Sequence, residues 1–106
     1  MRQLLWWILA GTRGGPTRAQ IILTLKEQPM NSQQLANALQ VDYKTVRYHL
    51  DLLVSNQLLV SGEKRYGNMY FLLPELEANF PAFLEIWGKL GKKNKMAKDE
   101  PSRLRS

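Results

Sequence analysis

The chain has 106 residues, of which 44% are hydrophobic, and it carries a formal net charge of +6 and no cysteine. This length predicts one domain with a core too small for both a deep pocket and a catalytic apparatus, so we do not expect an enzyme. The lack of cysteine excludes disulfides, thiolate zinc sites, iron–sulfur clusters and thiol nucleophiles. We expect a cytoplasmic protein without cofactors.

The chain begins with an apolar stretch at residues 4–10 (LLWWILA). A membrane-spanning helix needs about 20 such residues, so we predict no transmembrane segment. For residues 1–11 we predict a short helix that packs on the domain or across a dimer interface. A membrane-surface anchor is the alternative.

Two short helices are expected next. The first spans about residues 16–28, since Pro16 suits a first helical turn and Pro29 ends the helix. Ser32 is the expected N-cap of the second helix, which ends near Gln40.

A third helix is expected at about residues 43–56, with Asp42 as its N-cap. The connection from the second helix has only three residues, Gln40 to Asp42, so the two helices must cross sharply, as in a helix-turn-helix. Apolar residues recur at helical spacing and are expected to face the core. They are Tyr43, Val46, Leu50, Leu53 and Val54.

A β-hairpin and a last helix are expected after these. Residues 58–61 and 69–73 are prone to form strands, and the basic segment 62–68 between them contains Gly and Asn, which indicates an exposed tip. Residues 74–91 have an apolar helical stripe, in which Pro81 predicts a restart or a kink. Residues 92–106 are a basic tail that is either solvated or adds phosphate affinity.

Three helices followed by a hairpin is the order of a winged helix-turn-helix. Residues 30–53 (MNSQQLANALQVDYKTVRYHLDLL) resemble the helix-turn-helix of ArsR-like regulators, and the resemblance covers residues 17–73. With residues 4–7 and 11–16, the sequence looks most like an archaeal branch. The resemblance implies a mainly α fold with a small β-hairpin (α+β), a winged domain at 16–73 and flanking N- and C-terminal helices.

Two features depart from this family. Many helix-turn-helix motifs place glycine at the turn, where the backbone is left-handed, but this chain has Gln40 there. Metal sensors of the family commonly use cysteine thiolates, which this chain lacks, so metal sensing of that kind is excluded. Neither a metal nor a small-molecule effector is indicated.

The third helix is expected to enter the major groove of double-stranded DNA. Its outward face presents Lys44, Thr45, Arg47, Tyr48 and Asp51. We expect Arg47 and Tyr48 to contact bases, with Lys44 and Thr45 shared between bases and phosphates. Ser32 and Gln33 at the start of the second helix complete the predicted contacts. A merely solvated polar face is the alternative.

The hairpin tip and the one histidine carry further predictions. Lys64 and Arg65 are placed to reach the minor groove or the flanking backbone, and Tyr66 to stiffen the wing; alternatively, these cations only protect an exposed strand edge. His49 is expected to be a partly buried, hydrogen-bonded ring, because one histidine without cysteine cannot form a metal site.

A homodimer is expected, because one recognition helix buries too little surface for useful specificity. The predicted interface comprises Leu4, Trp6, Trp7, Ile8, Phe80, Phe83, Leu84 and Trp87. The sequence thus predicts a dimeric, sequence-specific transcription regulator. The alternative is a winged-helix module for protein or membrane interaction with only nonspecific DNA affinity.

Overall fold

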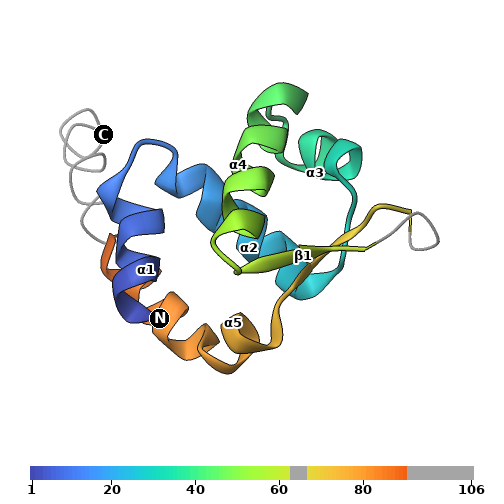
Figure 1. The fold of residues 1–106 in the computed structure, drawn as a ribbon. Coiled ribbons are helices and arrows are strands. Elements are labelled where there is room, and N and C mark those ends of the chain that lie inside the picture. The colour runs from blue at the N-terminus through green and yellow to red at the C-terminus, as the bar shows by residue number, and fades with distance from the viewer. Residues whose placement is uncertain (63–66, 91–106) are drawn as a thin grey trace, which may run out of the picture.

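The structure is a computed structural model and describes residues 1–62 and 67–90. Helices and one hairpin follow each other along the chain (Figure 1). They are α1 (Arg2–Trp6), the π-helical turn η1 (Trp7–Gly11), α2 (Gly15–Glu27), α3 (Ser32–Leu39), α4 (Tyr43–Ser55), β1 (Leu59–Ser61), β2 (Tyr70–Leu72) and α5 (Pro74–Ala78). Residues 80–90 form another helix. This confirms the mainly α fold with a small hairpin.

The helix that follows α5 settles the question raised by Pro81. The chain turns at Asn79 and becomes helical again at residue 80. Pro81 therefore lies in the first turn of a new helix, where its missing N–H costs nothing. The helix restarts there.

The hairpin is antiparallel, and β2 is also bonded to the segment that leads into α3. Leu59 pairs with Leu72, and Ser61 with Tyr70. Tyr70 N also donates to the carbonyl oxygen of Met30 at 2.8 Å. The segment that leads into α3 is therefore joined to the hairpin.

The starts of α3 and α4 are fixed by side-chain caps. Asn31 Oδ1 accepts from Gln34 N at 2.8 Å while Gln34 Oε1 accepts from Asn31 N at 2.9 Å, which is a capping box. The prediction of Ser32 as the cap is wrong, because the reciprocal pair forms one residue earlier. For α4 the predicted cap is confirmed, since Thr45 N donates to Asp42 Oδ2 at 3.2 Å.

The turn between α3 and α4 has the left-handed backbone expected of this motif. Gln40 has φ 54° and ψ 46°, although a side chain disfavours this conformation. Val41 N donates to the carbonyl oxygen of Ala36 at 3.1 Å. The turn is therefore built with the usual geometry and a strained glutamine.

The terminal helices pack on each other and on the core. The helix of residues 80–90 lies beside α1 in Figure 1, and Arg2 pairs with Glu85 at 2.5 Å. Three residues predicted for the dimer interface are buried within the single chain: Ile8 and Phe83 are fully buried, and Phe80 is 9% exposed. They belong to the same core cluster as the buried residues of α2, β1 and β2.

Candidate nucleic-acid interface

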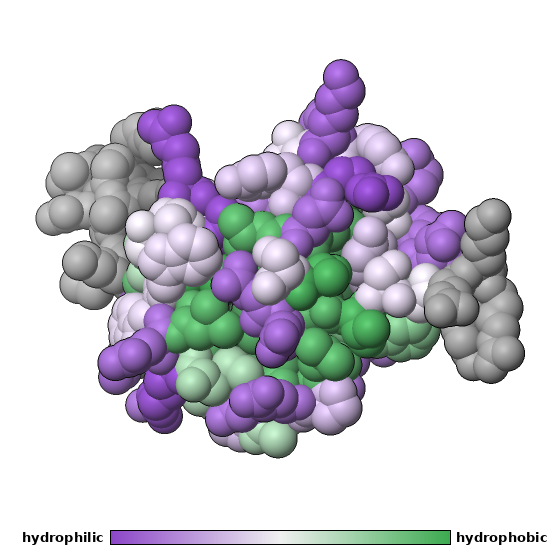
Figure 2. Space-filling view, in the orientation of Figure 1, coloured by the Kyte–Doolittle hydropathy of each residue, from purple (hydrophilic) through white to green (hydrophobic). Residues whose placement is uncertain are grey.

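The outward face of α4 is polar and accessible. Lys44, Thr45 and Arg47 are exposed, and Tyr48 is 60% exposed. Val46, Leu50 and Leu53 are fully buried on the opposite side, so packing fixes which way the helix faces. The end of the molecule where α3 and α4 meet is hydrophilic, at the top of Figure 2.

Tyr43 belongs to this outward face and not to the core. The prediction that it packs inward is wrong, because 42% of the side chain is exposed. Ser32 Oγ donates to the Tyr43 hydroxyl at 3.4 Å. This contact lowers the pKa of the Tyr43 phenol, and a smaller contribution in the same direction comes from the Arg47 guanidinium. Tyr43 therefore links the start of α3 to α4.

A polar hollow of about 460 Å³ separates these helices from the hairpin. Its walls come from the start of α3, from α4 and from the tip side of the hairpin. They comprise Asn31, Ser32, Gln33, Tyr43, Arg47, Ser61, Gly67, Asn68 and Tyr70. The hollow brings two predicted contact residues of α3, Ser32 and Gln33, to the same site as Arg47.

Arg47 also has a partner on its own helix. Its guanidinium lies 3.9 Å from the Asp51 carboxylate, one turn along α4. Both side chains are largely exposed, so the pair is weak and exchangeable. The contact with Tyr43 raises the pKa of Arg47, which keeps its positive charge at every physiological pH.

Of the other predicted site residues, Lys64, Arg65 and Tyr66 at the hairpin tip and the tail at 92–106 lie outside the described residues. The predicted dimer surface is reduced to exposed Trp6, Trp7 and Leu84 with half-buried Leu4 and Trp87. These side chains belong to α1, η1 and the helix of residues 80–90.

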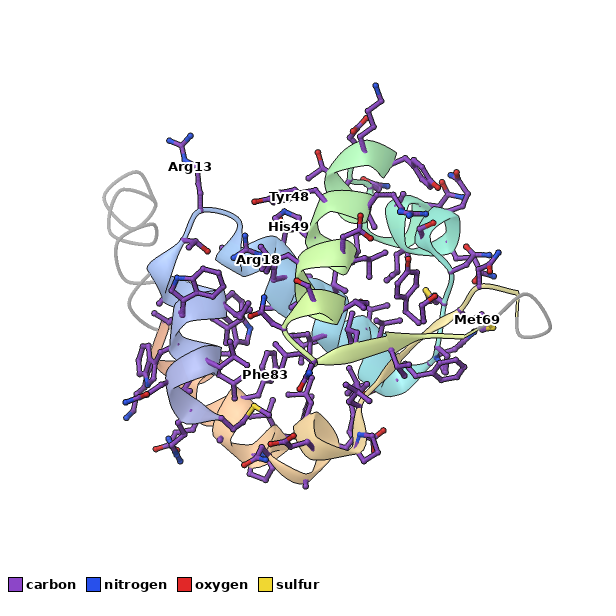
Figure 3. The ribbon with its side chains drawn as sticks, viewed as in Figure 1. Arg13, Arg18, Tyr48, His49, Met69 and Phe83 are labelled. Atoms are coloured by element: carbon purple, nitrogen blue, oxygen red, sulfur yellow. The ribbon has the colours of Figure 1, made fainter. Side chains whose placement is uncertain are left out.

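A buried polar pair behind α4 was not predicted from the sequence. His49 is 5% exposed, as its place next to the core stripe suggested, and Arg18 of α2 is 2% exposed. Arg18 Nε donates to His49 Nδ1 at 3.1 Å. Figure 3 shows the two side chains pointing toward each other from α2 and α4. The contact between Arg18 and His49 is visible only in the folded structure, because nothing in the spacing of residues 18 and 49 indicates it.

Within residues 1–62 and 67–90, no three His, Asp or Glu side chains gather into a group that would hold a metal ion. In the same part of the chain, every helix is too short or too polar to cross a membrane.

Comparison with known proteins agrees with this geometry. Residues 15–59 match the family model described as bacterial regulatory protein, arsR family. Over these residues the chain is similar to the arsR family, and its helices and hairpin follow the winged helix-turn-helix order. The matched residues run from the first turn of α2 to the start of β1 and so include both helices of the motif. No curated protein matches the chain.

Two solved structures share this fold. The crystal structure of a probable transcriptional regulator from Pseudomonas aeruginosa has a TM-score of 0.61 and 18% identity, and the match covers 97% of this chain and 87% of that one. The structure of a cysteine-to-serine mutant of Lactococcus lactis ZitR has a TM-score of 0.54 and 19% identity, with 92% and 81% covered. Both structures are bacterial, and the archaeal placement stays a prediction.

Proposed function

We propose that this chain is a homodimeric transcription regulator that binds double-stranded DNA sequence-specifically, with α4 in the major groove. The observation that carries the proposal is the outward face of α4, where Lys44, Arg47 and Tyr48 are exposed and Arg47 also lines the polar hollow. An α-helix fits the major groove, and arginine donates to guanine O6 and N7. The ArsR-type match supports the same function.

The hollow supplies the contacts to the DNA backbone in this proposal. Ser32, Gln33 and Tyr43 line it with hydroxyl and amide groups, which are typical donors to phosphate oxygens. Phosphate contacts fix the register of a protein on the duplex, while base contacts select the sequence. We therefore assign positioning to the α3 side and sequence selection to Arg47 and Tyr48, with Lys44 and Thr45 contacting both. The wing, residues 62–68, lies on the flanking backbone or minor groove.

Selection of bound sequences from a pool of random duplexes tests this function. Fluorescence anisotropy then compares the selected duplex with a scrambled one for the wild type, for Arg47→Ala/Tyr48→Ala, and for Lys89→Ala as a charge-matched control. One good base contact contributes about 1–3 kcal/mol, so the double variant should lose at least about tenfold in affinity for the selected duplex. Lys89→Ala should retain the preference. Equal binding of both duplexes by all three proteins would contradict the proposal and favour an interaction module.

The proposed dimer uses the exposed aromatic surface of the terminal helices. Trp6 is 39% exposed, Trp7 44% and Leu84 48%, and large apolar side chains of this kind are enriched at interfaces. Sedimentation equilibrium should show a dimer that becomes a monomer in Trp7→Glu/Leu84→Glu. Val60→Glu, at an apolar position of β1 that is 42% exposed, should leave the dimer intact. A monomeric wild type would overturn this part of the proposal.

A further inference from the structure

Arg18 is a fully buried arginine that no carboxylate neutralises within the described residues. A buried charge is costly unless hydrogen bonds replace its lost hydration. Here neutral acceptors do so. Nη1 donates to the carbonyl oxygen of Ile8 at 2.9 Å and to Thr12 Oγ1, and Nε donates to His49 Nδ1 at 3.1 Å.

These hydrogen bonds join three parts of the molecule. Ile8 and Thr12 belong to the N-terminal segment, residues 2–14, which carries the exposed Trp6 and Trp7. His49 belongs to α4, and Arg18 itself to α2. Among the described residues, the Arg18 side chain therefore connects the N-terminal segment directly to the recognition helix.

The connection depends on the state of the imidazole. His49 Nδ1 can accept a hydrogen bond from Arg18 only while the ring is neutral, because both nitrogens of the charged ring are donors. In the charged ring, Nδ1–H would point at the N–H donor of Arg18, so the hydrogen bond would be lost. The two positive charges would also repel each other. Burial, and then the charge of Arg18, lower the pKa of His49, so the folded chain favours the neutral ring.

Few other charges face this ring. Gly14, which precedes α2, packs so closely against the ring that a Cβ at this position would lie 2.5 Å from His49 Cε1. Tyr48, on α4 itself, meets the ring edge-on at a centroid distance of 5.2 Å. Arg13 points away from it into solvent in Figure 3. Among the described residues, Arg18 is thus the charged group in direct contact with His49.

We propose that Arg18 and His49 form a positioning contact that holds the N-terminal segment against the recognition helix while the imidazole is neutral and releases it when the imidazole is protonated. The consequence for DNA rests on the proposed function. Release would disconnect the exposed aromatic surface of the proposed dimer from α4, so the two recognition helices would lose their fixed spacing.

Tryptophan fluorescence tests the contact without DNA, since all three tryptophans, Trp6, Trp7 and Trp87, lie in or against the N-terminal segment. We would record the emission of the full chain from about pH 7.5 to about pH 4.5, because the pKa of His49 lies below the ordinary histidine value. The wild-type emission should move to longer wavelength with a midpoint below the ordinary histidine value of 6.5. His49→Asn should not show this transition, because the amide oxygen accepts from Arg18 and does not titrate. The same transition in His49→Asn, or a flat wild-type profile, would overturn the proposal.

A second pair of variants separates the contact from general charge effects. Arg18→Met removes the donors to Ile8, Thr12 and His49 and should give the long-wavelength emission at every pH. Arg13→Met removes an exposed arginine from the same region and should behave as the wild type. Wild-type behaviour of Arg18→Met would also overturn the proposal.

DNA binding tests the consequence separately. One pH unit below the midpoint, only about a tenth of the molecules keep the neutral ring, so the apparent affinity for the selected duplex should fall about tenfold. His49→Asn should show no such fall. A chain that shows the fluorescence transition but binds no selected duplex would contradict the proposed function and leave the Arg18–His49 contact standing.

Discussion

Gly15 lies directly against the carbonyl of Leu9. A Cβ atom on Gly15 would lie 1.9 Å from that oxygen, far inside van der Waals contact. The end of η1 and the first turn of α2 therefore pack backbone on backbone, a distance that only glycine permits.

Gly15→Ala should consequently destabilise the chain. The added methyl group meets backbone, which cannot rotate away as a side chain can, so we expect a loss of about 2 kcal/mol or more in the free energy of unfolding. Urea denaturation measures it. Gly88→Ala is the control, because no atom lies within 4 Å of a Cβ there, and it should stabilise its helix by about 0.5–1 kcal/mol. Equal stability of Gly15→Ala and wild type would refute the close packing.

Gln40→Gly should stabilise the helix-turn-helix. Gln40 has φ 54°, and this left-handed backbone costs a residue with a side chain about 1–2 kcal/mol of stability. Glycine removes that cost, but its more flexible unfolded chain cancels part of the gain. We expect a net gain of about 0.5–1 kcal/mol in denaturation. Gln20→Gly, in the exposed interior of α2, should instead lose about 0.5 kcal/mol. A loss at both positions would show that the turn gains nothing from glycine.

Asp51→Asn should increase DNA affinity. The Asp51 carboxylate lies 3.9 Å from Arg47, so it competes with DNA for the guanidinium and repels phosphate. An exposed pair contributes about 0.2–1 kcal/mol, which corresponds to a gain of about 1.4- to fivefold at low salt. Glu27→Gln removes the same charge at the end of α2, away from the outward face of α4, and should change the anisotropy titration little. Equal gains in both variants would indicate only a general charge effect.

Tyr43→Phe should weaken DNA binding without unfolding the chain. The hydroxyl that Ser32 and Arg47 contact is lost, and one such hydrogen bond contributes about 0.5–1.5 kcal/mol, or about two- to tenfold in affinity. The side chain is 42% exposed, so the free energy of unfolding should stay within about 0.5 kcal/mol. Unchanged affinity for the selected duplex would remove Tyr43 from the interface.

The local elements could be predicted because their signals are local. Asp42 as a cap, Pro16 in a first turn and the apolar spacing of residues 46, 50 and 53 each act within one or two turns. The cap of α3 was misplaced by one residue because Asn31 and Ser32 are both good caps, and only the reciprocal bond with Gln34 distinguishes them.

The errors in the site came from long-range packing. Tyr43 shares the helical stripe of Val46 and Leu50, but at the first residue of α4 its side chain is 42% exposed and lies against Ser32 of α3 instead of in the core. Ile8, Phe80 and Phe83 are predicted from the sequence as dimer surface, but in the structure they belong to the hydrophobic core of the single chain. The Arg18–His49 contact spans 31 positions and has no sequence signal.

The bond from Tyr70 to Met30 gives the wing a fixed base. Because the segment before α3 pairs with β2, the hairpin and the helix-turn-helix keep one fixed arrangement. Under the proposed function, β2 and α4 therefore meet the duplex as a single body.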